Sequence, residues 1–295
     1  MKEAYGEATR FHKNSLELIA KCDAIVTDYA RQGFKLTIRQ LYYQLVARGL
    51  VENTVRSYDN VQNLMTNARL AGLIDWDVIE DRTRGFIDRP HWTSGRQIMH
   101  SAAHSYHEDM WSEQECRVFV VVEKEALAGV LERVCREYDC PLLPARGYPS
   151  ASTLREFAKE RIMGACPQIV ILHLGDHDPS GIDMTRDLAE RLTLFSRDTI
   201  DISFKRIALN MDQIDELKPP ANPAKVTDSR FESYRAHYGD ESWELDALSP
   251  QYIHALVEEH VKPYIDWDQW RLTQARIEGV RTRIQTLADN FEDIE

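Results

Sequence analysis

The sequence predicts an α/β plus α fold, in which an N-terminal winged-helix unit precedes a doubly wound parallel α/β domain and C-terminal helices. Two patterns indicate this: three short helical patterns within the first 72 residues, and then a change at Arg117 to continuous apolar runs alternating with helices. A chain of 295 residues is long enough for about two compact units. We therefore expect a small helical unit joined to a larger sheet domain.

The N-terminal unit is expected to contain three helices. Asn14 and Glu17 open the first, which ends near Gly33. A capping box of Thr37 and Gln40 opens the second. The expected helices cover residues 14–33, 37–49 and 57–72.

The stretch from Trp76 to Gly85 could form a small wing, which would complete a winged helix-turn-helix. Between residues 31 and 100, ten basic and seven acidic residues leave a local charge of +3. The whole chain carries −12, so the remainder carries −15. A locally basic module in an acidic protein is a candidate DNA reader, with a chance imbalance on a solvated face as the alternative.

The α/β domain is expected over about residues 115 to 210. Its first strand, RVFVVV, is apolar throughout, as in a parallel strand covered on both faces. A loop rich in Pro and Asn follows the domain, and polar helices begin at Ser249. The expected strands are residues 117–122, 141–145, 168–174 and 202–209, and the expected helices are 126–138, 152–163 and 181–195.

Composition excludes several classes of protein. A hydrophobic share of 43% with 28% charged residues is typical of a globular chain, and −12 argues against a protein that simply coats nucleic acid. Five scattered cysteines without a CxxC pair indicate reduced thiols and a cytoplasmic location. No apolar run approaches the roughly 20 residues that cross a bilayer, and no phosphate-loop or dinucleotide motif is present.

Three acids occupy the positions where an α/β sheet binds ligands, beyond the carboxyl ends of its strands. Glu123 follows the first strand, and Asp176 and Asp178 follow the strand QIVILHL. Converging carboxylates repel one another unless a cation lies among them, and Mg²⁺ or Mn²⁺ is the natural choice. The alternative is that Asp176 begins a turn and caps the next helix, while Glu123 is an ordinary strand-end charge.

The helix after Thr37 carries a second candidate group. Its apolar stripe predicts that Tyr42 packs in the core, whereas Tyr43 lies off the stripe, on the surface, over Arg39 one turn earlier. Arg39 could favour the phenolate of Tyr43 or hold a phosphate by two hydrogen bonds. The alternative is an ordinary surface pair. The stripe consists of Ile38, Leu41, Tyr42, Leu45 and Val46.

Four further residues are candidates for DNA contact. Lys124 could bind phosphate, Lys35 could contact DNA, and Asn67 and Arg69 on the third helix could enter the major groove. For each of these, a plain surface position is the alternative.

Several stretches resemble the A subunit of type IIB DNA topoisomerases (topoisomerase VI) and the related meiotic double-strand-break transesterase. Their order and spacing agree over roughly residues 35 to 250. The chain is shorter than a typical A subunit and looks most like the compact stand-alone topoisomerase mini-A type. The matching stretches are TIRQLYY (37–43), VVVEKEAL (120–127), RGYPSAST (146–153), LGDHDPSGID (174–183), RIAL (206–209) and WELDAL (243–248).

The resemblance implies a winged-helix domain joined to a Toprim domain, with DNA as substrate. Tyr43 matches the family nucleophile and Arg39 the Arg before it, while Glu123, Asp176 and Asp178 match the Toprim metal acids. The implied reaction is double-strand cleavage through a covalent 5′-phosphotyrosyl link. The implied assembly is a homodimer on double-stranded DNA, with the Tyr of one protomer serving the metal site of the other.

The expected divisions are an N-terminal helix (1–34), a winged-helix domain (35–112), a Toprim domain (113–250) and C-terminal helices (251–295). A location in the cytoplasm with the nucleoid is expected. Longer A subunits pair with a GHKL-type ATPase B subunit. For a chain this short, the resemblance leaves open whether such a partner exists. The alternative functions are a Toprim nuclease, such as a defence effector, and a non-catalytic winged-helix DNA-binding protein.

Overall fold

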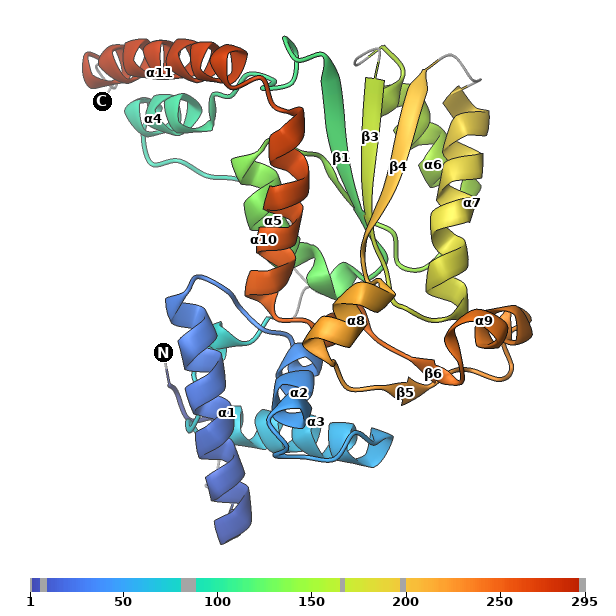
Figure 1. The fold of residues 1–295 in the computed structure, drawn as a ribbon. Coiled ribbons are helices and arrows are strands. Elements are labelled where there is room, and N and C mark those ends of the chain that lie inside the picture. Colours follow the sequence, from blue (N-terminus) through green and yellow to red (C-terminus); the bar gives the residue numbers. More distant parts are fainter. Residues whose placement is uncertain (1, 6–9, 81–88, 165–167, 197–199, 292–295) are drawn as a thin grey trace.

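A computed structural model covers the chain, and structure is described here for all residues except 1, 6–9, 81–88, 165–167, 197–199 and 292–295. Figure 1 shows a mixed α/β protein in which helices surround a parallel sheet, with a smaller helical unit below. The mixed α/β class expected from the sequence is therefore confirmed. No helix in the described part of the chain is long and apolar enough to span a bilayer.

The helical unit contains α1 (Lys13–Arg31), α2 (Ile38–Ala47) and α3 (Val55–Leu70). Each lies where the sequence pattern placed it, with ends that differ by one or two residues. The capping box forms as expected, because Thr37 Oγ1 accepts from the Gln40 backbone N–H while Gln40 Oε1 accepts from that of Thr37. This box sets the direction in which α2 leaves the preceding loop.

The expected wing is not seen in the part that is described. Trp76–Val78 is a single 3₁₀ turn, and Ile79 makes an isolated parallel bridge with Leu36. Residues 81–85, the rest of the expected wing, lie outside the described residues. Thus the three helices are present, and a paired wing strand is absent from residues 76–80.

The sheet has four parallel strands, β1 (Cys116–Val122), β2 (Leu142–Pro144), β3 (Gln168–Leu174) and β4 (Asp201–Ala208), in the order β2-β1-β3-β4. All three pairings are parallel, as the alternation of strands and helices predicted. The chain leaves β1 toward β2 and then crosses to β3 on the other side. The carboxyl ends of β1 and β3 therefore flank the switch point, where doubly wound sheets bind ligands.

Two helices cover each face of the sheet (Figure 1). One face packs against α5 (Ala128–Glu137) and α10 (Pro250–Val261), and the other against α6 (Ala151–Phe157) and α7 (Pro179–Ser196). Successive residues of a strand point to opposite faces, so a strand covered on both sides must be apolar throughout. This explains the unbroken run RVFVVV.

One apolar cluster joins the helical unit to the first face of the sheet. It includes Leu41 and Met65 of the helical unit together with Val120 of β1 and Leu131 of α5. At the junction, Arg133 of α5 donates to the Gln32 carbonyl at 3.0 Å. The helical unit is thus packed on the α/β domain through a shared core.

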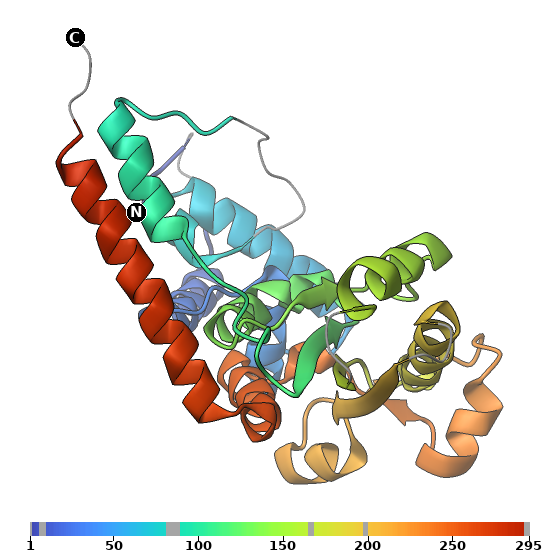
Figure 2. The same ribbon diagram turned by 90° about the horizontal axis from the view of Figure 1, so that it is seen from above.

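The remaining elements lie at the carboxyl end of the sheet and in an arm. Below the sheet lie α8 (Met211–Leu217), α9 (Phe231–Tyr238) and the short antiparallel pair β5 (Asn222–Pro223) and β6 (Glu241–Ser242). The arm consists of α4 (Gly95–Ser105) and α11 (Trp267–Asp289), which lie side by side (Figure 2). Shorter turns are the 3₁₀ segments Glu125–Leu127, Leu245–Ala247 and Lys262–Tyr264 and the π turn Ala158–Ile162.

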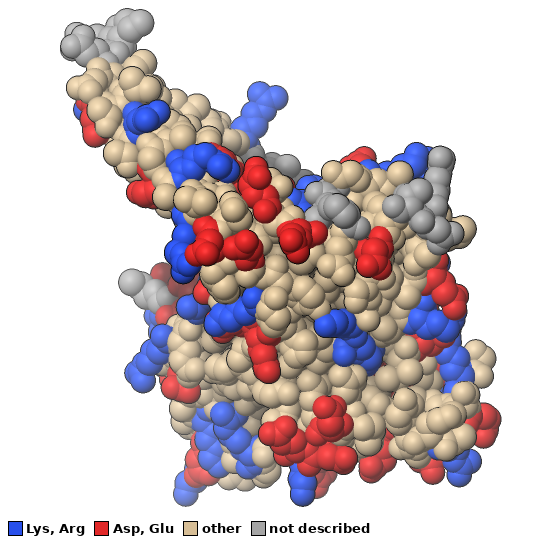
Figure 3. Space-filling view, turned by 45° about the horizontal axis from the view of Figure 1, so that its top comes forward, with Lys and Arg blue, Asp and Glu red and all other residues tan. Residues whose placement is uncertain are grey.

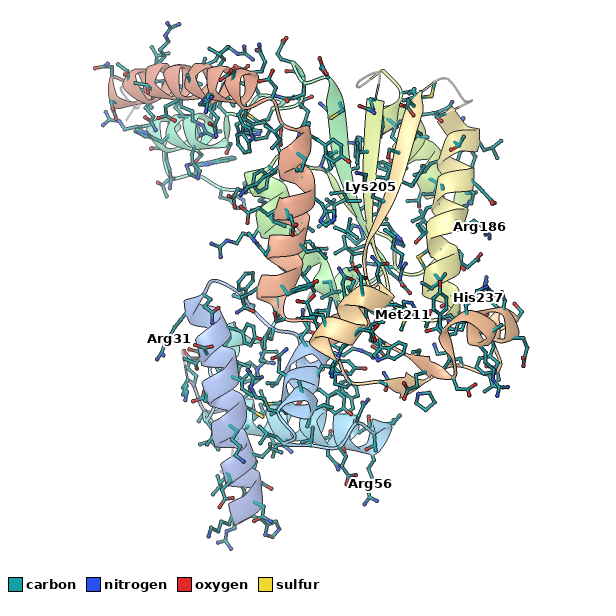
Figure 4. The ribbon with its side chains drawn as sticks, viewed as in Figure 1. Arg31, Arg56, Arg186, Lys205, Met211 and His237 are labelled. Carbon is teal, nitrogen blue, oxygen red and sulfur yellow. The ribbon has the colours of Figure 1, made fainter. Side chains whose placement is uncertain are left out.

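Charge is distributed unevenly along the chain but mixed on the surface. On the face in Figure 3, acidic and basic side chains are interspersed and form no continuous basic area. Arg31 and Arg56, labelled in Figure 4, are exposed and project away from the helical unit. Arg31 and Arg56 thus contribute to the +3 of residues 31–100 as separate exposed side chains.

Candidate active site

The acids predicted to bind metal lie together at the carboxyl ends of β1 and β3. Glu123 Oε2 accepts a hydrogen bond from the Asp176 backbone N–H at 2.9 Å, which links the ends of the two strands. A Cβ atom at Gly181 would lie 2.2 Å from the Asp176 carbonyl oxygen and 3.1 Å from Glu123 Oε2. Glycine is therefore required for this close approach between the start of α7 and the acids.

Asp178 also performs the capping role that the alternative reading assigned to Asp176. Asp178 Oδ1 accepts from the Gly181 backbone N–H at 2.6 Å and from Ser180 Oγ at 2.9 Å, at the start of α7. Asp176 Oδ1 instead accepts from the Leu245 backbone N–H at 2.8 Å. Asp178 thus caps helix α7 and also lines the same cavity as Glu123 and Asp176.

Burial is the main cause of the raised pKa values of Glu123 and Asp176. Burial and the neighbouring Asp176 raise the pKa of Glu123 to about 7, and burial raises that of Asp176 to about 6. Nevertheless, within the described residues no group of three or more His, Cys, Asp or Glu side chains is arranged to hold a metal ion. The three carboxylates are neighbours that do not surround a common point.

Lys124 lies between Asp176 and two acids of the later WELDAL segment. Its Nζ lies 2.9 Å from Asp176 Oδ2, 2.8 Å from Glu244 Oε2 and 2.9 Å from Asp246 Oδ2. Burial alone would lower the pKa of Lys124, but the attraction of Asp246, Asp176 and Glu244 outweighs it and raises that pKa. Lys124 is therefore committed to carboxylates and does not present its ammonium to a DNA surface.

Arg39 extends this network to helix α2. Its Nε donates to Glu244 Oε2 at 3.0 Å and lies 3.5 Å from Asp246 Oδ2. Burial would raise the pKa of Glu244, but Lys124 and Arg39 outweigh burial and hold it at about 2. The guanidinium carbon of Arg39 lies 6.0 Å from the centre of the Tyr43 ring, so the two residues are neighbours on α2 as their spacing predicted.

The surface position expected for Tyr43 is wrong. Tyr43 is 4% exposed, because it belongs to the same apolar core cluster as Leu41 and Tyr42 and because Asn222, Pro223 and Glu244 line the pocket beside it. Its hydroxyl accepts a hydrogen bond from Asn222 Nδ2 at 3.4 Å. Burial, followed by the charge of Glu244, raises the pKa of Tyr43 to about 12.

Tyr42 is equally buried, and its hydroxyl is fully bonded. The hydroxyl lies 3.1–3.2 Å from the Glu52 and Thr54 carbonyl oxygens and from Asn53 Oδ1, and it accepts from the Thr54 backbone N–H at 2.9 Å. The packing role predicted for Tyr42 is confirmed. Of the two adjacent tyrosines, Tyr43 has the less engaged hydroxyl.

Two adjoining cavities hold these groups. The phenol pocket, of about 370 Å³, contains Tyr43, and the acid cavity, of about 450 Å³, contains Glu123, Asp176 and Asp178. Helix α2 also contacts the turn Leu245–Ala247 directly. The tyrosine and the acids of one chain therefore face adjoining spaces. The residues that line both cavities are Arg39, Asn222, Pro223 and Glu244.

Residues 175–178 join β3 to α7 and carry Asp176 and Asp178, and we call them the acid loop. This loop is held by Arg206, a residue to which the sequence analysis assigned no role. The buried guanidinium of Arg206 donates to the carbonyl oxygens of Gly175 at 3.0 Å, Asp176 at 2.6 Å and Gly181 at 2.9 Å. Asn222, Glu244 and Asp246 are further site residues without a predicted role. The only sequence signal for Arg206, Glu244 and Asp246 was their position in the RIAL and WELDAL stretches.

The other DNA-contact candidates lie apart from this site. Lys35 and Asn67 are exposed, and Asn67 lines a separate cavity beside α1. Arg69 stacks on Trp76 with its guanidinium carbon 4.3 Å from the ring centre. The structure thus groups Arg39, Tyr43, Glu123, Lys124, Asp176 and Asp178, and it leaves the other three outside.

Comparison with known proteins did not identify a family for this chain. A scan against protein-family models gave no match, and a search of the curated proteins gave none either.

Proposed function

We propose that the chain is a metal-dependent DNA transesterase of winged-helix and Toprim organisation, in which Tyr43 attacks a backbone phosphate. The observation that supports this most is that the phenol pocket and the acid cavity adjoin each other and share Arg39 as a lining residue. A phenol, a guanidinium and a set of buried carboxylates are the groups that phosphoryl transfer to tyrosine requires. The TIRQLYY and LGDHDPSGID stretches resemble those of the type IIB topoisomerase A subunit, and this resemblance agrees with the assignment.

The proposed reaction exchanges one phosphodiester for another. The oxygen of Tyr43 forms a bond to phosphorus, the bond from phosphorus to the deoxyribose 3′ oxygen breaks, and that oxygen leaves with a proton. The product is a 5′-phosphotyrosyl link and a free 3′ hydroxyl. Because the number of phosphoester bonds is unchanged, resealing needs no ATP.

Arg39 has two duties in this scheme. In the free chain its charge favours the phenolate of Tyr43, although burial and Glu244 have the larger effect in the opposite direction. A DNA phosphate would compete with Glu244 for the guanidinium, since both are oxyanions that accept paired hydrogen bonds. Arrival of DNA would thus release part of the network while it positions the phosphate beside Tyr43.

Glu123, Asp176 and Asp178 are the residues that would hold Mg²⁺ or Mn²⁺. The donor set fits, because hard divalent ions prefer carboxylate oxygens and the three carboxylates line one cavity, where burial first and then Asp176 raise the pKa of Glu123. Binding would require these side chains to rearrange, since no three such groups among the described residues are placed to hold an ion. When bound, the ion would offset negative charge on the scissile phosphate oxygens.

Two strands require two tyrosines, so we propose a homodimer on double-stranded DNA. Exchange of Tyr43 between protomers, implied by the resemblance, stays a prediction. Gel filtration with and without DNA tests the dimer, and a monomer under both conditions would count against it.

The direct test uses supercoiled DNA and Mg²⁺, a detergent quench, and detection of protein attached to the cut ends. Tyr43→Phe should lose attachment by at least about a thousandfold, since it removes the nucleophile. Tyr42→Phe is the matched control and should keep attachment. Cutting retained in Tyr43→Phe would favour a Toprim nuclease, and absence of cutting with any metal would favour a DNA-binding protein without catalysis.

A further inference from the structure

Lys124 makes the set of contacts that a bound cation would make. Its ammonium has three N–H donors, and three carboxylates lie 2.8–2.9 Å away, from Asp176, Glu244 and Asp246. These acceptors come from two separate parts of the chain, the loop after β3 and the segment after β6. Each donor has one charged acceptor, which leaves the ammonium saturated.

Asp176 belongs to both groups of acids in the cavity. Its backbone N–H binds Glu123 Oε2, and its Oδ2 binds Lys124. Glu123 and Asp178 therefore lie to one side of Asp176, while Glu244 and Asp246 form the second acid group with Lys124. Two-metal phosphoryl-transfer sites have a comparable plan, with acidic ligands on either side of a shared carboxylate.

Asp246 is the strongest sign that this second group is built around a positive charge. It is fully buried, and its Oδ1 has no hydrogen-bond partner within the described part of the chain. A buried carboxylate is costly unless a cation pairs with it. Lys124, with help from Arg39 at 3.5 Å, provides that cation.

We propose that Lys124 is a resident cation that takes the place of a second metal, so that the site binds one divalent ion. This proposal rests on the metal site of the proposed function. It assigns Lys124 a positioning role: the ammonium holds Glu244, and through Glu244 it holds Arg39 beside Tyr43. Glu244 and Asp246 are therefore partners of Lys124 and are not metal ligands.

The test counts Mn²⁺ ions bound to the full-length chain by electron paramagnetic resonance, without DNA. The wild type should bind one ion. Lys124→Met removes the charge at similar size and frees three grouped carboxylates, so this variant should bind two. Lys225→Met is the matched control, because Lys225 lines the same cavity and makes no ion pair with described residues; it should still bind one.

A second comparison does not depend on the folding of Lys124→Met. Glu244→Gln should keep one Mn²⁺ at near wild-type affinity, whereas Asp178→Asn should weaken that ion at least about tenfold. Two ions on the wild type, one of them lost in Glu244→Gln, would overturn the role of Lys124 and leave the transesterase intact. A folded Lys124→Met variant that binds one ion would also overturn it. No Mn²⁺ on the wild type would overturn the proposed metal site together with this inference.

Discussion

The acid cavity and the phenol pocket adjoin each other but differ in how firmly their functional groups are bonded. In the acid cavity, Lys124 has three carboxylate partners, and Arg206 binds three carbonyl oxygens of the acid loop. In the phenol pocket, the hydroxyl of Tyr43 has one long contact of 3.4 Å to Asn222. The charged groups of the acid cavity are thus firmly hydrogen-bonded, whereas the Tyr43 hydroxyl, which would react, has a single weak hydrogen bond to a described residue.

This contrast follows from the chemistry that each side would perform. Carboxylates and ammonium groups buried without partners are costly, so they must be bonded before substrate arrives. A nucleophile with strong hydrogen bonds would have to break them before it could attack. The difference leads to four predictions, given from the largest expected effect to the smallest.

Raising the pH from about 7 to about 9 should speed covalent attachment to DNA about a hundredfold under single-turnover conditions. The reason is that the pKa of Tyr43 is raised to about 12, so the phenol is neutral near pH 7 and its phenolate fraction grows with pH. Rapid-quench measurements at saturating Mg²⁺ give the profile, and Tyr42→Phe should share its slope. A flat profile would mean that another group takes the proton.

Arg206→Met should destabilise the fold by about 3 kcal/mol or more, because it removes the charged hydrogen bonds that tie the Gly175, Asp176 and Gly181 carbonyl oxygens together. Urea denaturation measures this free energy. Arg191→Met is the matched control: Arg191 also binds a carbonyl oxygen, that of Pro149, and an acid, Asp187, but it binds one carbonyl oxygen and not three, so a loss of about 1 kcal/mol is expected. Equal losses would contradict the rigid acid loop.

Acid should destabilise the acid loop and the end of β3, which contain His177 and His173. Burial lowers the pKa of His173 to about 3 and that of His177 to about 4, so both imidazoles are neutral in the folded chain. A lowered histidine pKa stabilises above the unfolded value of about 6.5, and this is lost as pH falls toward 4. For His177 the loss at pH 5 is about 2 kcal/mol.

The contribution of the histidines must be measured separately from that of Glu123. The raised pKa of Glu123 makes the fold more stable as pH falls, whereas the lowered histidine pKa values make it less stable. The difference in urea midpoint between wild type and His177→Gln should shrink between pH 7 and pH 5. Imidazole resonances in NMR should show both rings neutral at pH 5.5. Titration of both rings near pH 6.5 in the folded chain would contradict the prediction.

The two adjacent tyrosines provide the smallest and sharpest comparison. Tyr42→Phe should cost about 1–2 kcal/mol, because the backbone N–H of Thr54 loses its acceptor, whereas Tyr43→Phe should change stability by less than about 0.5 kcal/mol. Thermal denaturation of the two variants measures both values. If Tyr43→Phe were the more destabilising, the phenol of Tyr43 would be a structural group and not an uncommitted one.

Much of the fold could be predicted from local patterns. The run RVFVVV identified a strand covered on both faces, and Thr37 with Gln40 marked the start of α2. These signals are readable because hydrophobic periodicity and caps act over a few residues. The proximity of Glu123 to Asp176 was also accessible, because the carboxyl ends of neighbouring parallel strands meet at one edge of a sheet.

The burial of Tyr43 could not be predicted from helix α2 alone. The face opposite the apolar stripe looked solvent-exposed, but Asn222 and Glu244, about 180 and 200 residues later in the chain, cover it. The ion pairs of Lys124 were hidden for the same reason. No local pattern reports which distant segment packs on a given face.

The sequence by itself determined the order of helices and parallel strands, the three acids at the strand ends, and the Tyr and Arg one turn apart on α2. Only the tertiary structure decided that Tyr43 is buried, that Lys124 pairs with Asp246, and that the phenol pocket adjoins the acid cavity of the same chain. The physical reason is the distance along the sequence over which each kind of interaction acts. Capping and periodicity depend on neighbours in sequence, whereas burial and charge pairing depend on contacts made when the WELDAL segment packs between helix and sheet.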